Sequence, residues 1–187
     1  MHPRELLNCV VGDVWPKSWK DYLDCQVNSE RSMQASMYYH LRQAGIHSII
    51  EPKMGDMYPD MIVVEGDTIL AVMELKFVPH HYPGYEKDQN TLSHFLAIAK
   101  GADEAAKRIP ELVLDPATGK FDKKRAYNLT PETLFIAPYI GRCDSASLRR
   151  ETWTQLRDET NFHLIIGPVH SKKLVSDILC DQEQCCG

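Results

Sequence analysis

Hydrophobic residues are concentrated in one stretch of the chain, residues 59–77, where polar positions are few. β-Branched and aliphatic residues fill two arms on either side of Gly66-Asp67, and a glycine followed by aspartate suits a two-residue hairpin loop. Because nearly every position in both arms is apolar, both faces of the strands should be covered, as in an α/β core. The pattern therefore predicts a buried β-hairpin that turns at Gly66-Asp67.

Two other stretches carry apolar residues at helical spacing. The first runs from about Ser29 to Ala44, with Asn28 or Ser29 as the N-cap and Gly45 as the stop. The second covers residues 86–108, and Ile109-Pro110 should end it. Shorter patterns predict strands at 47–51, 133–137 and 162–166, and a helix from Ser145 to about Arg157.

The remaining segments carry weaker patterns. Residues 1–28 are interpreted as an N-terminal extension, in which a short helix around Trp15 and Trp19 could pack on the domain as scaffold. Residues 111–130 are expected to form a loop insertion, and residues 180–187 a frayed, cysteine-rich tail. A chain of 187 residues can bury its own core, so we expect a single domain.

The formal net charge of −5 argues against a simple nucleic-acid-binding module, which usually has a basic surface. It does not exclude a nuclease, because acids that hold a metal add negative charge and a local basic patch can still meet phosphate. No apolar run approaches the length of a membrane span, and no apolar segment follows the first residues as it does in a secretory signal. We therefore expect a cytoplasmic protein with reduced cysteines.

Three polar residues interrupt the hairpin away from its turn: Asp60 in the first arm, and Glu74 and Lys76 in the second. With a simple two-residue loop Asp60 would lie across from Met73, whereas a bulge or a three-residue loop would place it across from Glu74. In both cases two carboxylates come close together at one end of the hairpin, with an ammonium beside them. Two such carboxylates repel each other, and a bound divalent cation such as Mg²⁺ or Mn²⁺ would remove this unfavourable electrostatic energy.

The sequence Pro59-Asp60, followed by thirteen residues and then Glu74-Leu75-Lys76, resembles the active-site signature of the PD-(D/E)XK nucleases, the restriction-endonuclease-like superfamily. The order of elements over residues 28–77 is similar to the front half of archaeal Holliday-junction resolvases. The resemblance implies an α/β fold with an αβββαβ core, in which helices flank a mixed central sheet. It also implies a metal-dependent nuclease, with DNA expected over RNA because most members cut DNA.

The resemblance implies roles for individual residues. Asp60, Glu74 and the carbonyl of Leu75 would hold Mg²⁺ or Mn²⁺, and Lys76 would orient the attacking water. A helix glutamate is the third acid in the resolvase-like nucleases, and this role falls to Glu30, acting directly or through water. Glu30 also lies within the apolar stripe of its helix, although an acid in the first turn equally suits the helix dipole.

Further residues are candidates for contact with the substrate. Related nucleases often use a Gln or Lys from the second long helix near the phosphate, which points to Gln89. The Q-x-x-x-Y pattern of some relatives is not matched, because Ser93 stands at the Tyr position. The basic candidates, either phosphate contacts or solvated side chains, are Lys120, Lys123, Lys124, Arg125, Arg149 and Arg150.

The cysteines and a histidine pair are weaker candidates. Cys25 together with Cys180, Cys185 and Cys186 resembles the iron–sulfur sites of CRISPR-associated and helicase-linked exonucleases of the superfamily. The late spacing is C-x4-C-C, and two adjacent cysteines do not easily bind one cluster, so we do not expect one. His80-His81 is interpreted as loop surface, since adjacent histidines rarely bind one ion.

Two alternatives to a nuclease stay open. A catalytically inactive nucleic-acid-binding or assembly module could keep the acids on the same fold. A small-molecule phosphodiesterase or other hydrolase would need a closed pocket in place of an open groove. The oligomeric state is also open, with a homodimer among the options.

Overall fold

The computed structural model describes residues 1–78, 86–101, 105, 107–141, 153, 156 and 158–168. Helical segments come first: α1 (Pro3–Cys9), the π-helical segment η1 (Val10–Val14), α2 (Trp15–Leu23) and α3 (Glu30–Gln43). Four short strands follow: β1 (Ser48–Ile50), β2 (Met61–Glu65), β3 (Thr68–Met73) and β4 (Lys76–Val78). The remaining elements are α4 (Glu86–Lys100), β5 (Arg108–Asp115), β6 (Lys120–Asn128), β7 (Leu134–Gly141) and β8 (Phe162–Pro168).

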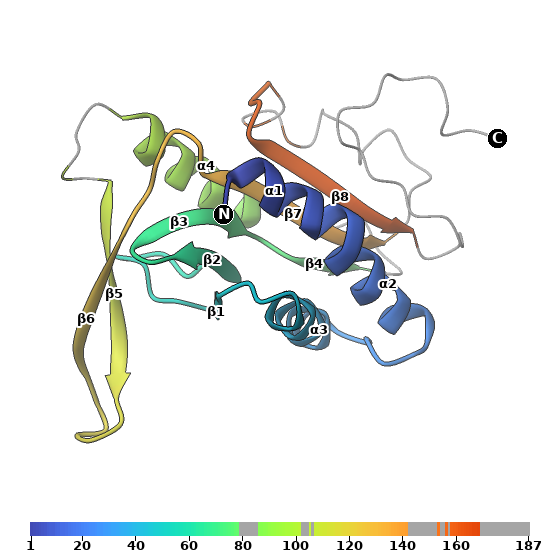
Figure 1. The fold of residues 1–187 in the computed structure, drawn as a ribbon, viewed down its shortest axis with the longest axis horizontal. Helices are drawn as coiled ribbons and strands as arrows, with labels where there is room; N and C mark the ends of the chain where they lie inside the picture. The colour runs from blue at the N-terminus through green and yellow to red at the C-terminus, as the bar shows by residue number, and fades with distance from the viewer. Residues whose placement is uncertain are drawn as a thin grey trace.

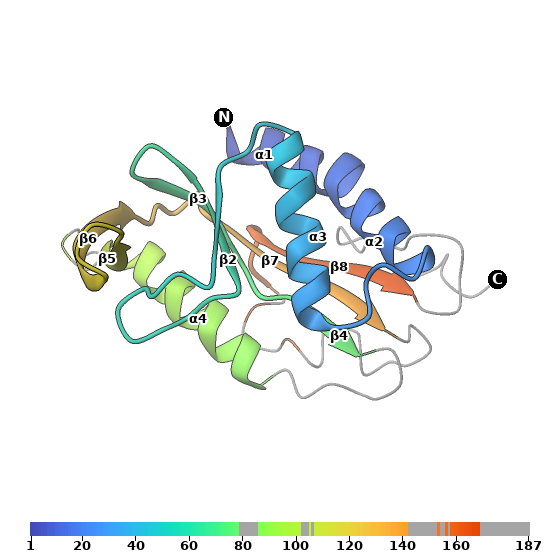
Figure 2. The same ribbon diagram turned by 90° about the horizontal axis from the view of Figure 1, so that it is seen from below.

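The strands form one mixed eight-stranded sheet with helices on both faces (Figures 1 and 2). β1, β2 and β3 pair antiparallel, whereas β7 pairs in parallel with both β3 and β8. One core cluster joins the sheet to α4, and the other joins it to α1, η1 and α3. Neighbouring residues of β2 enter opposite clusters, Ile62 the first and Val63 the second. The prediction of an α/β protein with a hairpin covered on both faces is therefore confirmed.

The hairpin of β2 and β3 turns at Gly66-Asp67, as its sequence predicts. Gly66 has a φ of +62°, a left-handed conformation that suits glycine at the first position of a two-residue turn. A β-bulge at Leu70 of β3 then shifts the register, so that Met61 pairs with Met73. The next residues along, Asp60 and Glu74, consequently lie across from each other, which is the alternative expected from a bulge.

The first long helix agrees with its prediction at both ends, but the second does not. Ser29 caps α3 by accepting a hydrogen bond from the Ser32 amide, and Gly45, with a φ of +75°, follows the helix. α4 ends at Lys100, so the prediction that it continues to residue 108 is wrong. Glycine is a common helix terminator, and Gly101, whose amide donates to the carbonyl of Ala97, directly follows the helix.

The prediction of a loop at residues 111–130 is also wrong, because β5 and β6 form an antiparallel ribbon there. Figure 1 shows the ribbon reaching away from the rest of the sheet, which it joins where Asn128 pairs with Thr68 of β3. In β5, buried Ile109 and Glu111 alternate with exposed neighbours. This two-residue period is the signature of a strand, but it is short and partly built from charged residues.

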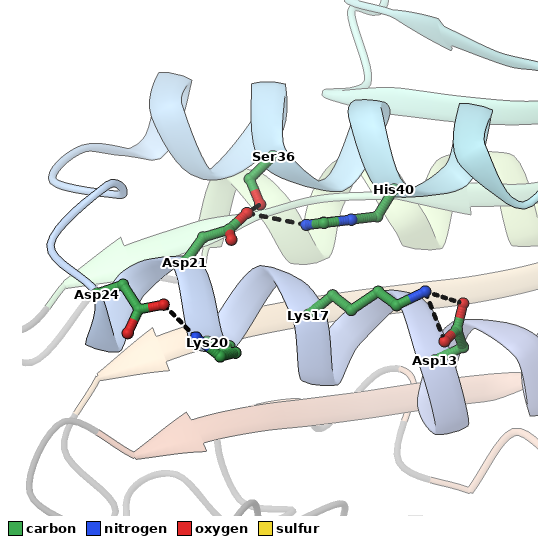
Figure 3. A network of polar contacts seen from close by, with 7 residues as sticks. All are labelled: Asp13, Lys17, Lys20, Asp21, Asp24, Ser36 and His40. Atoms are coloured by element: carbon green, nitrogen blue, oxygen red, sulfur yellow. Dashed lines mark hydrogen bonds and ion pairs between the residues drawn. The ribbon is translucent and has the colours of Figure 1, made fainter.

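The N-terminal helices pack on the sheet, and α2 contains the short helix predicted around its two tryptophans. The Asp21 carboxylate of α2 accepts a hydrogen bond from Ser36 Oγ (2.7 Å) and lies 2.9 Å from His40 Nε2, which ties α2 to α3 (Figure 3). Gly167 of β8 lies against the Trp19 ring so closely that a Cβ there would be 2.6 Å from it. No helix among the described residues is long and apolar enough to span a membrane.

The strands predicted at 47–51, 133–137 and 162–166 correspond to β1, β7 and β8. Most of the predicted helix at 145–157 lies outside the described residues, together with His80-His81 and the tail at 180–187. Within 145–157 only Trp153 and Leu156 are described, and both are buried.

Candidate active site

The predicted active-site residues meet at one end of the sheet. Asp60 directly precedes β2, Glu74 directly follows β3, Lys76 begins β4, and Glu30 is the first residue of α3. Figure 2 shows β4 beside the first turn of α3. The bulged hairpin brings the first two residues together, and the start of α3 supplies the third acid from the neighbouring layer.

Asp60 is fixed by hydrogen bonds from three directions. Its Oδ2 accepts from the Leu75 amide at 2.6 Å, and its backbone carbonyl accepts from Gln34 Nε2 (2.7 Å) and from the Glu51 amide (3.0 Å). A side-chain oxygen of Asp60 thus takes the Leu75 amide that a strand carbonyl would otherwise bind. The Leu75 amide donates to Asp60 in this site, whereas the sequence resemblance implied that the Leu75 carbonyl would bind the metal.

The second arm of the hairpin is not one continuous strand, and this contact is one of two causes. The sequence predicts a single arm through Phe77, but Glu74 and Leu75 separate β3 from β4. On the side of β7 the chain runs on in the same register, with the Glu74 amide donating to the Ile136 carbonyl at 3.1 Å. In that register Leu75 lies across from Pro138 of β7, which has no N–H to donate. The strand is therefore interrupted on both sides, by Pro138 towards β7 and by the Asp60 carboxylate towards β2.

Glu74 is a buried acid with an unsatisfied oxygen. Its exposed fraction is 2%, and Oε1 has no hydrogen-bond partner. Burial, followed by the negative charges of Asp60 and Asp88, raises the pKa of Glu74 to about 9. Without a cation, Glu74 is therefore protonated at neutral pH.

Asp60 shows the same effect to a smaller degree. Burial raises its pKa to about 6, the Leu75 amide opposes that shift, and the charges of Glu30 and Asp88 add to it. The two acids that face each other in the hairpin both hold protons more tightly than free carboxylic acids do. The site accordingly favours a positive charge between them.

Lys76 supplies positive charge nearby. Its Nζ lies 3.8 Å from Glu30 Oε2 and 3.1 Å from Asp88 Oδ2. Burial disfavours the ammonium, but the charges of Asp88 and Glu30 outweigh it, so the pKa of Lys76 lies above its usual value. Glu30 also accepts a long hydrogen bond (3.4 Å) from the Phe77 amide, and its side chain is 45% exposed. Glu30 thus borders the cluster at its solvent side.

Asp88 belongs to this cluster and was missed in the sequence. It lies in the first turn of α4, is 4% exposed and pairs with Lys76. The signal was present, because Asp88 precedes Leu92, Phe95 and Ala99 at helical spacing, as Glu30 precedes the stripe of its own helix. The sequence reading chose the adjacent residue Gln89, which is half-buried.

The basic run lies elsewhere. Lys120, Lys123, Lys124 and Arg125 are all in β6, which meets β3 at Thr68, the end opposite Glu74. Six residues of strand separate these ends by about 20 Å. Exposed Arg125 interacts with its own strand, and a hydrogen bond with Tyr127 raises its pKa. The run is therefore not adjacent to the carboxylates, and Arg149 and Arg150 lie outside the described residues.

The cluster offers few donor atoms for a metal ion. Among the described residues, no group of three or more His, Cys, Asp or Glu side chains is arranged to hold one. Two acids nevertheless fit the chemistry of a hard divalent cation, since Asp60 and Glu74 offer only oxygen donors and Glu74 Oε1 is buried without a partner. Mg²⁺ and Mn²⁺ are the ions that such donors suit.

The chain was also compared with known proteins. No protein-family model, curated protein or solved structure matches it. The functional inference rests on the cluster formed by Glu30, Asp60, Glu74, Lys76 and Asp88.

Proposed function

We propose that this protein is a metal-dependent phosphodiesterase of the PD-(D/E)XK type, a nuclease that acts on DNA. The observation that carries the proposal is the pair of buried carboxyl groups, Asp60 and Glu74, held across from each other with Lys76 beside them. One Glu74 oxygen is buried and has no hydrogen-bond partner. A buried acid of this kind is costly unless a proton or a cation neutralises it.

The order of elements supports the same proposal. From α3 onward a helix is followed by the antiparallel strands β1, β2 and β3, then by β4, α4 and the β5–β6 ribbon, and then by β7 parallel to β3. With β4 and the ribbon as additions, this is the order expected of the αβββαβ core of restriction-endonuclease-like enzymes. The carboxyl groups lie where β2 and β3 meet, as the signature requires.

Asp60 and Glu74 would hold the cation, with Glu30 at the solvent side of the cluster. A bound divalent ion supplies charge neutralisation at the phosphate and makes water more acidic. In the hydrolysis itself, the oxygen of one water adds to phosphorus and one P–O ester bond breaks. One proton of the water ends on the leaving oxygen, so the products are a phosphate monoester and a hydroxyl group.

Lys76 would assist this step as a charge. Its pKa lies above the usual value, so it remains an ammonium at neutral pH and cannot accept a proton from water. It can donate hydrogen bonds to the attacking water and offset negative charge on the phosphate. Its position beside the carboxylates fits that role.

A catalytically inactive nucleic-acid-binding or assembly module is the second candidate. What favours it is that Lys76 already pairs with Glu30 and Asp88, so its ammonium is engaged in ion pairs within the protein. Such a module would bind nucleic acid or a protein partner without cutting.

A cleavage assay separates the two candidates. Linear, circular and branched DNA and a single-stranded RNA would be incubated with Mg²⁺, Mn²⁺ or Ca²⁺, using the parent protein, Asp60→Asn and Glu74→Gln. Glu132→Gln, which changes an exposed acid outside the cluster, is the matched control. We expect Mg²⁺- or Mn²⁺-dependent cleavage by the parent and the control alone. Binding without cleavage in any metal would favour the inactive module.

A further inference from the structure

We propose that Asp88 is a positioning residue that holds the Lys76 ammonium in place for the reaction. Its catalytic consequence rests on the proposed function, whereas the contact itself can be tested without any cleavage. The structure assigns this role through an ion pair between α4 and β4, which links the second long helix to the carboxylate cluster.

The geometry makes Asp88 the stronger of the two partners of Lys76. The distance from Nζ is 3.1 Å to Asp88 and 3.8 Å to Glu30, and the Asp88 side chain is 6% exposed against 45% for Glu30. Attraction between charges is stronger when solvent does not screen them. Oδ2 of Asp88 is buried and has no partner besides the Lys76 ammonium, so the ammonium is its compensating charge.

The competing explanation is that Asp88 only stabilises the start of α4. Acids in a first turn interact favourably with the helix dipole, but an exposed acid does so without being buried, and Glu86 in the same turn is exposed. Asp88 instead faces the sheet, where an unpaired carboxylate is costly. Helix stabilisation alone does not require that position.

Fixing Lys76 matters because its side chain is long and its strand is short. β4 has three residues, and a lysine side chain has four rotatable bonds, so the backbone alone does not determine where the ammonium lies. Without Asp88, the remaining partner of Lys76 is Glu30 at the solvent side. A displaced charge at a reacting centre reduces the rate without a comparable loss of binding.

The central variant is Asp88→Asn, which keeps the shape and removes the charge. We expect kcat to fall about 10- to 100-fold, with KM for DNA and Mn²⁺ affinity by calorimetry each changed less than about threefold. Asp88→Glu keeps the charge and should recover part of the rate. Glu86→Gln in the same turn should behave like the parent. An unchanged rate in Asp88→Asn would overturn the proposal, and so would a tenfold loss of Mn²⁺ affinity, which would make Asp88 a ligand.

A double-mutant cycle with Lys76→Met tests the contact itself in metal-free buffer. The urea midpoints of Asp88→Asn, Lys76→Met and the double variant should be non-additive, because either single change leaves a buried group without its partner. Additive midpoints would overturn the proposal. If the parent cuts no nucleic acid, the nuclease proposal fails, while non-additive midpoints would still support Asp88 as the residue that holds Lys76.

Discussion

A buried carboxyl group beside another carboxyl group has to be protonated, paired or bound to a cation. At the scale of single residues, this choice governs the behaviour of Asp60 and Glu74. One Leu75 amide stabilises Asp60, whereas Glu74 Oε1 has no such donor. Burial is the largest cause of both raised pKa values, and the Leu75 amide, which lowers the pKa of Asp60, has no counterpart at Glu74.

The metal-free protein should therefore lose stability as the pH rises. The pKa values of Asp60 and Glu74 are raised in the folded state, to about 6 and about 9, so the folded state binds more protons than the unfolded state above about pH 4. Their contribution to the free energy of unfolding is fully present at low pH. It decreases as the pH rises through these values, by on the order of 5 to 10 kcal/mol.

Urea unfolding in EDTA between pH 5 and 9 measures this loss, with Glu74→Gln expected to lose less over the same range. Added Mn²⁺ should stabilise the parent more at pH 8 than at pH 6, because the cation competes with protons for the same oxygens. A parent whose stability is independent of both pH and Mn²⁺ would contradict the prediction.

Glu74 and Lys76 lie two residues apart, but their replacement should have different effects on metal binding and cleavage. Glu74→Gln should weaken Mn²⁺ binding and cleavage together, because a ligand is lost. Lys76→Ala should leave Mn²⁺ binding intact or slightly tighter, since a repulsive charge is gone, while cleavage drops by about 10²-fold or more. Calorimetric titration beside a cleavage assay measures both effects. If Lys76→Ala cuts as fast as the parent, Lys76 serves only the ion pairs at the end of the strand.

At the scale of elements, the β5–β6 ribbon is the candidate for contact with the nucleic-acid backbone. Replacing Lys120, Lys123 and Lys124 by Gln should lower DNA affinity alike for all sequences. It should also reduce the slope of log affinity against log salt by about 0.9 for each lost phosphate contact. Binding isotherms at several salt concentrations measure this, with Lys17→Gln/Lys20→Gln on α2 as the control. An unchanged slope would show that the lysines are only solvated.

Elements with strong local signals were predictable from the sequence, and the ribbon was not. The β2–β3 hairpin has its glycine turn and apolar arms, and α3 has both a serine cap and a terminating glycine. The strands of the ribbon pair with each other over most of their length, and pairing between charged segments leaves little hydrophobic pattern. Secondary structure of this kind depends on the partner strand, which a local pattern does not reveal.

The candidate site was predictable for the same local reasons, with one exception. Asp60, Glu74 and Lys76 belong to one hairpin, so strand geometry alone brought them together. Asp88 comes from α4, and only the packing of that helix on the sheet shows that its carboxyl group faces Lys76. The sequence also left two partners possible for Asp60, Met73 or Glu74. Only the bulged register of the structure shows that Glu74 is its neighbour.

At the scale of the whole molecule, the N-terminal helices and the last described strand support each other. Gly167→Ala would place a Cβ 2.6 Å from the Trp19 ring and 3.1 Å from that of Trp15, so α2 or β8 must shift. We expect a loss of about 1–3 kcal/mol in the free energy of unfolding. Gly12→Ala is the control, because its added methyl group meets open space. Equal stability of the two variants by urea unfolding would show that the helices adjust at no cost.

The carboxylate cluster and the point where the ribbon joins the sheet lie at opposite ends of β3, and this separation sets the length of a ligand that follows β3 from one to the other. The distance of about 20 Å corresponds to about six base pairs at 3.4 Å each. A duplex of four base pairs could occupy one location but could not bridge the two. Affinity for end-capped duplexes should therefore rise in a step between about four and ten base pairs, and a smooth rise with length would mean that the ribbon and the cluster do not share one ligand.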